Sequence, residues 1–336
     1  MLIQFNSTPL YSHNLQSSNK VCSKPIYKNL SQLSVDTVSF GIGEKQLDKT
    51  ALTIRNELAK KVVKEAKEDA QELKFILNKF LRPYFSTQKH PNNLIRVTNG
   101  EIKTRIKGED SLRKKVTPRM INTKYGVKNV GDLIGARIVL RDSSAGSVDA
   151  VLFSIANAVK QGALRIVEIE KYNPVQGKIP VKNIKKLGYG TNNGLNILEN
   201  VSGVTSQVGT QKSGYPAIHI TVKTKHGYKA EIQIMDENVE DLKHVEDICY
   251  KIRCNKGVPS KYKNVEADIL PSFNDIKSKG LEDSYMDYVK DSYLTAFRSQ
   301  AKEFKSKIKP KFLQIPYFLP PKLDFNYIAK KMQECN

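Results

Sequence analysis

The hydrophobic pattern along the chain separates a polar leader from a helical segment and a region of strands and helices. Residues 1–43 are rich in Ser, Asn, Gln and Lys without a sustained period, and they are predicted to be a disordered leader. From residue 44 apolar side chains recur at helical spacing, and Pro83 is expected to end this helix. Similar spacing predicts further helices over residues 148–159, 237–253 and 281–307.

Period-two alternation of apolar and polar residues predicts four strands. They are "DLIGARIVLRD" from Asp132, "ALRIVEIEKY" from Ala163, "AIHITVKT" from Ala217 and "YKAEIQIM" from Tyr228. The last two are close in sequence and meet at "KHGY", which predicts a hairpin. Residues 172–212 lose all period and are predicted to be a long loop or insertion.

The predicted hairpin has one polar face. Tyr228, Ala230, Ile232 and Ile234 fall on one side of the second strand, and Lys229, Glu231 and Gln233 fall on the other. His219 and Thr221 alternate in the same way on the first strand. Such a face is either simply solvated or the wall of a functional site, and the hairpin alone leaves both readings open.

Other segments supply residues of complementary chemistry. "RIKGEDSLRKK" carries Arg105, Lys107, Ser111, Lys114 and Lys115, Asp132 precedes a strand, and "KSGYP" places Tyr215 on a turn. Carboxylates bind hard metal ions, cations neutralise transferring phosphates, and an exposed aromatic ring stacks on a base. This combination is typical of magnesium-dependent phosphoryl or pyrophosphoryl transfer.

The charge balance changes which partners are expected. The chain of 336 residues has a formal net charge of +21, which attracts polyanions such as nucleotides and RNA; a merely lysine-rich composition is the alternative. No apolar run is long enough to span a membrane, and the N-terminus lacks the pattern of a secretory signal. Four scattered cysteines favour a reducing, cytoplasmic setting.

Taken in chain order, four motifs resemble one family. "RIKGEDSLRKK", "VGDLIGARIVL", "KSGYPAIHITV" and "AEIQIM", followed by a helix with Glu246, resemble the synthetase domain of the RelA/SpoT alarmone enzymes, small and toxic alarmone synthetases included. The resemblance implies an α+β fold with a mixed, mainly antiparallel sheet flanked by helices, of the nucleotidyltransferase-like kind. The domains expected are a leader (1–43), an N-terminal helical segment (44–94), the synthetase domain (95–255, with the insertion at about 172–212) and a C-terminal helical extension (256–336).

The resemblance also implies an activity and a set of roles. The family transfers the β,γ-pyrophosphate of ATP to the 3′-hydroxyl of GDP or GTP with Mg²⁺, which makes the alarmone (p)ppGpp. Asp132 and Glu231 would be the catalytic and metal-binding carboxylates. The remaining roles would be ATP binding for Arg105, Lys107, Ser111 and Lys115, and acceptor binding for Lys212, Tyr215, His219 and Gln233. Each also has an ordinary reading, such as a solvated helix face for the lysines or a core-edge position for Tyr215.

Departures from the family pattern concentrate on the acceptor side. Met235 and Asp236 stand where the family usually has Arg and Thr, and Gln211 takes the place of an acceptor-side lysine. The acceptor therefore stays open between a guanine nucleotide, an adenine nucleotide and the 3′ end of tRNA, as in toxic relatives. A nucleotide- or RNA-binding module without catalysis is a further alternative. A homo-oligomer and an antitoxin-like partner also remain open.

Overall fold

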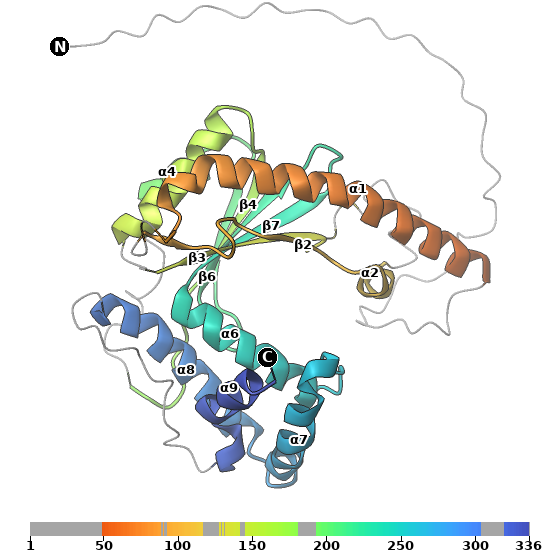
Figure 1. The fold of residues 1–336 in the computed structure, drawn as a ribbon, viewed down its shortest axis with the longest axis vertical. Coiled ribbons are helices and arrows are strands. Elements are labelled where there is room, and N and C mark those ends of the chain that lie inside the picture. Colours follow the sequence, from red (N-terminus) through yellow and green to blue (C-terminus); the bar gives the residue numbers. More distant parts are fainter. Residues whose placement is uncertain are drawn as a thin grey trace, which may run out of the picture. The chain divides into compact units, whose positions relative to one another are not determined.

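A seven-stranded mixed sheet carries the fold of the computed structural model (Figure 1). The structure describes residues 49–88, 90, 93–116, 128, 130, 132–141, 145–180, 193–303 and 319–335. The strands are β1 (Ile95–Arg96), β2 (Thr104–Ile106), β3 (Ile134–Leu140), β4 (Ile166–Tyr172), β5 (Thr205–Gly209), β6 (Ala217–Lys223) and β7 (Lys229–Asp236). The predicted leader lies outside the described residues.

The order of the strands brings distant parts of the sequence together. The sheet runs β1-β3-β7-β6-β4-β5, and β2 pairs with β3 beside this path. The pairs β3–β7 and β4–β5 are parallel, and the other described pairs are antiparallel. The predicted mixed, mainly antiparallel sheet flanked by helices is therefore confirmed, and so is the β6–β7 hairpin.

Helices precede, interrupt and follow these strands. Those before the hairpin are α1 (Lys49–Leu81), α2 (Glu109–Lys115), α4 (Ala145–Lys160) and α5 (Asn193–Glu199). Those after it are α6 (Glu237–Arg253), α7 (Lys263–Ser278), α8 (Glu282–Glu303) and α9 (Phe325–Gln333). Short 3₁₀ turns cover Arg82–Tyr84, Ser260–Tyr262 and Pro321–Leu323. None of the described helices combines the length and the apolar character that crossing a bilayer requires.

The first core fills the space between one face of the sheet and the helices α1 and α4 (Figure 1). Helix α1 contributes a stripe at spacings of three, four and seven residues, formed by Ala59, Val62, Ala66, Leu73 and Leu77. The strands contribute alternate residues such as Ile218, Ile220, Ile232 and Ile234, all fully buried. Because alternate side chains of a strand point to opposite faces, this packing leaves His219, Glu231 and Gln233 on the other face.

The second core joins the C-terminal helices to the end of the hairpin. It contains Met235, the penultimate residue of β7, together with residues of α6, α7, α8 and α9. Residues 319–335 pack here through Leu323, Phe325 and Ile328, so this tail folds onto its own chain. Residues 47–336 form one compact unit, so the predicted boundaries at 94 and 255 stay predictions.

Two segments differ from the sequence prediction. Residues 172–212 are not all loop, because α5 and the parallel edge strand β5 lie within them; residues 181–192 lie outside the described residues. Strand β5 is largely exposed, so it lacks the apolar alternation that identifies a strand. Helix α7 was not predicted, and Pro271 inside it removes one backbone donor and interrupts the pattern.

Candidate active site on the polar face of the sheet

The polar face of the sheet aligns side chains from five strands. The register places Glu170 of β4 opposite His219 of β6, His219 opposite Gln233 of β7, and Gln233 opposite Arg137 of β3. The neighbouring row runs from Thr221 through Glu231 and Gly135 to Arg105 of β2. The polar face of the hairpin is therefore more than a solvated surface. Its strands bring together cationic, carboxylate and amide side chains from residues 105 to 233.

A cavity of about 340 Å³ lies on this face. Its lining includes Arg105, Asp132, Glu231 and Gln233, four of the residues that the sequence motifs singled out. The remaining lining residues are Lys103, Thr104, Gly135, Ala136 and Arg137. The volume falls in the usual range for small-molecule sites, about 300–1,000 Å³.

Gly135 keeps the cavity wall open for an arginine. A Cβ atom added at this position would lie 3.3 Å from Nε of Arg105 and 3.4 Å from its Cγ. Arg105 is paired directly with Gly135 across the β2–β3 ladder, so its side chain crosses the sheet over the glycine. A larger residue at this position would push the guanidinium away from the cavity.

Two lysines neutralise Asp132 at one end of the cavity. Lys107 follows β2 and Lys115 ends α2, and both donate hydrogen bonds to Oδ2 of Asp132, that of Lys115 being 2.6 Å long. Burial raises the pKa of Asp132, but the bonds from the two lysines outweigh it, so the pKa is lowered from its ordinary value. Burial lowers the pKa of Lys107, despite the attraction of Asp132. We call Arg105, Lys107, Lys115 and Asp132 the basic end.

Helix α2 presents its other polar residues to solvent. Ser111 and Lys114 are exposed and lie outside the described lining of the cavity, while Leu112 of the same helix is fully buried. The ATP-binding role of Ser111 stays a prediction. The solvated reading suits Lys114, because α2 turns Lys115 and not Lys114 toward Asp132.

Glu231 lies at the other end of the cavity with two side-chain partners. Gln233 Nε2 donates to its Oε1 at 2.5 Å, and His219 Nδ1 lies 3.3 Å from its Oε2. Burial raises the pKa of Glu231, yet hydrogen bonds from His219 and Gln233 outweigh burial and lower that pKa. Glu231 is thus an ionised, oriented carboxylate, which suits a proton acceptor or a metal ligand.

Glu170 was missed by the sequence reasoning. One of its carboxylate oxygens, a ring nitrogen of His219 and a carboxylate oxygen of Glu231 lie within 4.8 Å of one another. The available signal was the alternation in "IVEIEKY", where Ile169 is buried and Glu170 faces the opposite side. Placing it beside His219 required the register of β4 on β6, which the sequence does not contain.

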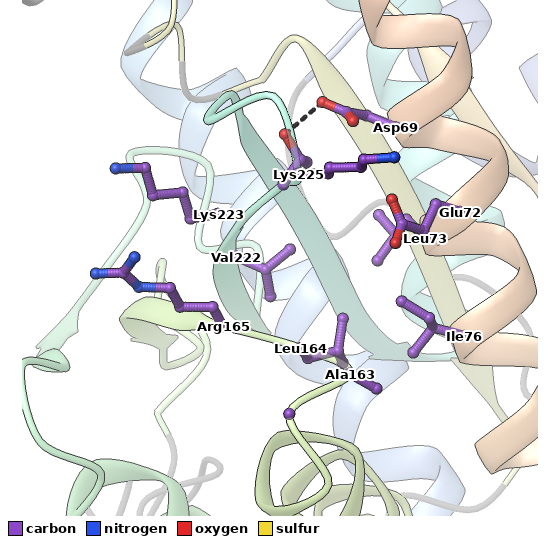
Figure 2. Close-up of a pocket in the computed structure, with 12 residues that line it drawn as sticks. Asp69, Glu72, Leu73, Ile76, Ala163, Leu164, Arg165, Val222, Lys223 and Lys225 are labelled. Carbon is purple, nitrogen blue, oxygen red and sulfur yellow. Dashed lines mark hydrogen bonds between the residues drawn. The ribbon is translucent and has the colours of Figure 1, made fainter.

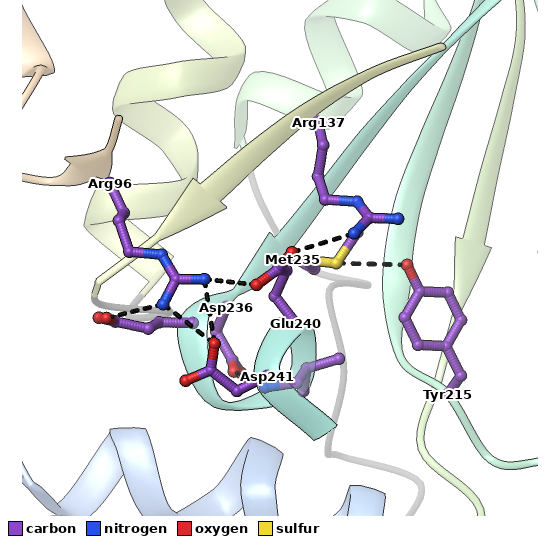
Figure 3. A network of polar contacts seen from close by, with 9 residues as sticks. Arg96, Arg137, Tyr215, Met235, Asp236, Glu240 and Asp241 are labelled. Atoms are coloured by element: carbon purple, nitrogen blue, oxygen red, sulfur yellow. Dashed lines mark hydrogen bonds and ion pairs between the residues drawn. The ribbon is translucent and has the colours of Figure 1, made fainter. Parts of the chain in front are cut away.

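The predicted acceptor residues do not all meet at the cavity. Tyr215 is only 5% exposed, and its hydroxyl donates to Sδ of Met235 at 3.4 Å (Figure 3). Its ring packs edge-on against Tyr293 of α8. Lys212 is exposed, and neither residue belongs to the described lining. The structure thus favours the core-edge reading of Tyr215, and its stacking role stays a prediction.

Two arginines fasten the cavity wall to the start of α6 (Figure 3). Arg137 Nη1 donates to Oε1 of Glu240 at 3.0 Å, and its Nη2 lies 3.4 Å from Oε1 of Gln233. Arg96 of β1 forms ion pairs with the carboxylates of Glu237, Glu240 and Asp241. Helix α6 is therefore held against β1 and β3 by charge as well as by packing.

Asp236 caps this helix from a buried position. Its Oδ1 accepts a hydrogen bond of 2.8 Å from the backbone N–H of Val239, and Oδ2 is buried without a partner among the described residues. Complete burial raises the pKa of Asp236 to about 8. The aspartate that departs from the family pattern is therefore structural, and it carries a proton at neutral pH.

The donor set of the cavity fits Mg²⁺. Asp132 and Glu231 line the same cavity, and carboxylate oxygens are the ligands that this ion prefers. Both have lowered pKa values, for the reasons given above, so both present charged oxygens. The two carboxylates are therefore the candidate ligands of this ion.

A second pocket lies on the side of the sheet covered by α1 (Figure 2). Its volume is about 260 Å³, and Asp69 and Glu72 of α1 face a wall that carries Arg165, Lys223 and Lys225. Asp69 accepts a hydrogen bond from Thr224, which ties α1 to the end of β6. This pocket contains none of the residues that the motifs singled out.

Comparison with known proteins gives structural neighbours only. No family model and no curated protein sequence matches the chain. A GTP pyrophosphokinase family protein from Streptococcus pneumoniae is 17% identical with a TM-score of 0.31, over 64% of this chain and 90% of that one. Small alarmone synthetase 1 from Bacillus subtilis, bound to its product pppGpp, is 15% identical with a TM-score of 0.31, over 73% and 94%.

A third neighbour, smu.1046c from Streptococcus mutans, is 14% identical with a TM-score of 0.33, over 73% of this chain and 92% of that one. Identities and TM-scores this low carry no information about substrate, so the roles of residues rest on the geometry described above. In structure the chain is similar to GTP pyrophosphokinase family proteins and small alarmone synthetases, the proteins that its sequence motifs resemble.

Proposed function

We propose that this chain is an ATP-dependent pyrophosphokinase that transfers the β,γ-pyrophosphate of ATP to the 3′-hydroxyl of a guanine nucleotide, making a (p)ppGpp-like product. One observation carries the proposal. Arg105, Asp132, Glu231 and Gln233 come from three separate motifs and line a single cavity. The cavity thereby combines cations for a triphosphate with a carboxylate suited to activate a hydroxyl.

The basic end would bind the triphosphate of ATP. Lys107 and Lys115 already hold one anionic group, the carboxylate of Asp132, and Lys103 and Arg105 add cations to the lining. Phosphate oxygens would compete with Asp132 for the two lysines. A carboxylate released in this way is free to coordinate the Mg²⁺ that accompanies ATP.

Asp132 and Glu231 would hold Mg²⁺, which would supply positive charge against the oxygens of the transferring phosphates. Arg105 would add a fixed charge over Gly135, where no side chain obstructs it. Gln233 donates to Oε1 of Glu231 and thereby orients the carboxylate within the cavity. Positioning and electrostatic stabilisation are the main contributions that a protein makes to this type of transfer.

Glu231 would accept the proton of the attacking hydroxyl. The acceptor 3′-oxygen forms a bond to the β-phosphorus of ATP while the bond from that phosphorus to the α,β-bridging oxygen breaks. AMP leaves, and the proton of the hydroxyl goes to Glu231. The lowered pKa of Glu231, which follows from the hydrogen bonds of His219 and Gln233, means that the carboxylate is ionised at neutral pH and carries no proton of its own when the hydroxyl attacks.

The deciding experiment offers γ-labelled ATP and Mg²⁺ with GDP, GTP, ADP, unlabelled ATP or bulk tRNA in separate reactions. Label in a guanine nucleotide, with an equal amount of AMP released, is expected. Release of ADP instead would indicate simple phosphoryl transfer and contradict the proposal.

Label in tRNA or in an adenine nucleotide would show that one of these is the acceptor in place of a guanine nucleotide. The transfer of pyrophosphate from ATP would still stand. The buried Tyr215 favours keeping this second candidate, because the ring predicted to stack on guanine is covered in this structure. No labelled product, with ATP still bound, would favour the binding module without catalysis.

A further inference from the structure

Glu170, His219 and Glu231 form a compact group of ligand-type atoms beside the cavity, here called the His–Glu group. They come from three adjacent strands, β4, β6 and β7, and their ligand atoms lie within 4.8 Å of one another. Glu231 lines the cavity, whereas Glu170 and His219 lie outside its described lining. Because the three residues sit on paired strands, the backbone of the sheet fixes their spacing.

No lysine or arginine forms an ion pair with this group. Within the part of the chain that the structure describes, Glu170 has no such partner and the one ion-pair partner of Glu231 is His219, although Lys103, Arg105 and Arg137 line the same cavity as Glu231. Asp132, by contrast, has two lysines. Two close carboxylates without a cation repel each other, and a bound cation relieves that repulsion.

The imidazole at the centre lacks a hydrogen-bond partner on one side. His219 is 8% exposed, and its Nε2 atom is buried with no partner among the described residues. Its Nδ1 atom lies 3.3 Å from Oε2 of Glu231. Buried polar groups are almost always satisfied, so the orphan nitrogen of an imidazole whose ring is grouped with two carboxylates indicates a ligand that completes the site.

Neighbouring side chains orient both carboxylates. The hydroxyl of Tyr172 and Nε2 of Gln207 donate to Oε1 of Glu170 at 2.7 and 2.8 Å. Gln233 does the same for Oε1 of Glu231. Hydrogen bonds of this kind hold ligating carboxylates in place around metal ions and raise metal affinity about 10- to 100-fold.

We propose that Glu170, His219 and Glu231 bind a divalent transition-metal ion. One imidazole nitrogen with two carboxylate oxygens favours ions such as Mn²⁺ and Zn²⁺ over Mg²⁺, which prefers oxygen ligands alone. This site shares Glu231 with the proposed Mg²⁺ site but replaces Asp132 by Glu170 and His219. It rests on the geometry of the group and not on the transfer reaction.

The test titrates the full-length, chelator-treated chain with Mn²⁺ in the absence of nucleotides and follows free Mn²⁺ by electron paramagnetic resonance. The wild-type chain is expected to bind one Mn²⁺, and Zn²⁺ is expected to displace it. Glu170→Gln and His219→Asn are expected to weaken binding at least about tenfold. Glu168→Gln, two residues earlier on β4, is the matched control and should bind as the wild type does.

Asp132→Asn separates this site from the predicted Mg²⁺ site, because it removes a ligand of the second but not of the first. Failure of the wild type to bind Mn²⁺, unchanged binding in Glu170→Gln, or an equal loss in Asp132→Asn would each overturn the proposal. Circular dichroism and thermal melting of each variant exclude misfolding. Glu170→Gln keeps the size and shape of the side chain, so it is less prone to misfold than His219→Asn. Transfer from labelled ATP, measured with Mg²⁺ on the same samples, shows whether the proposed function stands or fails separately.

Discussion

The two ends of the polar face balance their carboxylates in opposite ways. At the basic end Asp132 accepts hydrogen bonds from Lys107 and Lys115. In the His–Glu group, Glu170 and Glu231 meet one imidazole and no described lysine or arginine. At the basic end, an incoming anion such as a phosphate would take the place of Asp132 as the partner of the two lysines. At the His–Glu group, an incoming cation would find two carboxylates without a lysine or arginine ion pair. A nucleotide with its metal ion requires both properties side by side.

Asp236 extends the comparison with a third way to neutralise a carboxylate. It is fully buried, it caps α6, and it has neither a lysine partner nor a second ligand residue beside it in the described structure. Its raised pKa, caused by burial, means that a proton neutralises it, as two lysines neutralise Asp132 and as the proposed metal ion would neutralise the His–Glu group. An acidic residue here is therefore neutral where burial dominates, as at Asp236, and charged where hydrogen bonds and cations outweigh burial, as at Asp132.

The largest effect is expected from Glu231→Gln, which removes the carboxylate shared by both proposed metal sites. The amide keeps the shape of the side chain but cannot accept a proton, so transfer from labelled ATP should fall about a thousandfold while ATP binding persists. Glu168→Gln on β4 serves as the control, with β6 between that strand and the strand of Glu231. Undiminished turnover in Glu231→Gln would refute the role given to this residue.

Asp236→Asn tests the protonated carboxyl. The folded-state pKa is about 8 and the ordinary value is 3.8, so between these limits only the folded state holds the proton. The contribution of Asp236 to the free energy of unfolding is thus fully present below about pH 4. It is lost as pH rises toward 8, by about 1.4 kcal/mol per pH unit. The asparagine keeps the cap without ionising, so its free energy of unfolding should vary less between pH 5 and 8 in urea titrations.

A suitable control is Asp324→Asn, because Asp324 caps α9 in the same way but is only partly buried. This change should leave the pH dependence of the wild type intact. Equal slopes in the wild type and Asp236→Asn would show that Asp236 does not carry its proton in the folded chain.

Lys115→Ala measures the contribution of the basic end to ATP binding. Loss of one charge-assisted hydrogen bond to phosphate should raise the KM for ATP about tenfold. Lys114→Ala changes the adjacent residue of α2, which is also exposed but makes no described contact with Asp132. A comparable rise in the KM for ATP in both variants would show that the basic end contributes only general positive charge and no specific contact from Lys115.

Arg96→Gln should have the smallest effect, because the side chains of its ion pairs are partly exposed. Three carboxylates at the start of α6 would lose their shared partner, and we expect a loss of about 1 kcal/mol in the free energy of unfolding. The difference from the wild type should shrink in 1 M salt, where exposed charges are screened. A salt-independent loss would point to packing of the arginine side chain instead.

Much of the fold was predictable because its elements carry strong periodic signals. Helix α1 and strands β3, β6 and β7 each bury a regular apolar set against the first core, and the sequence shows that set directly. The same alternation placed Glu231 and Gln233 on the polar face, and the motifs added Arg105 and Asp132. All four line the cavity.

The remaining features depend on tertiary contacts that no local pattern encodes. Strand β5 is exposed along most of its length, and α7 contains a proline, so both lack an ordinary signal. Glu170 became a site candidate only through the register of β4 on β6. The burial of Tyr215 depends on Tyr293, which is distant in sequence and reaches it from α8.

Arg137 gives the cavity a thermodynamic link to the C-terminal helices. It lines the cavity and also pairs with Glu240 of α6, so a phosphate bound by Arg137 would compete with that pair. Such coupling is reciprocal: phosphate binding at Arg137 would weaken the Arg137–Glu240 pair by the same factor by which that pair weakens phosphate binding. Helix α6 packs on α8 in the second core, so residues that never touch the cavity share in setting how tightly it holds its ligand.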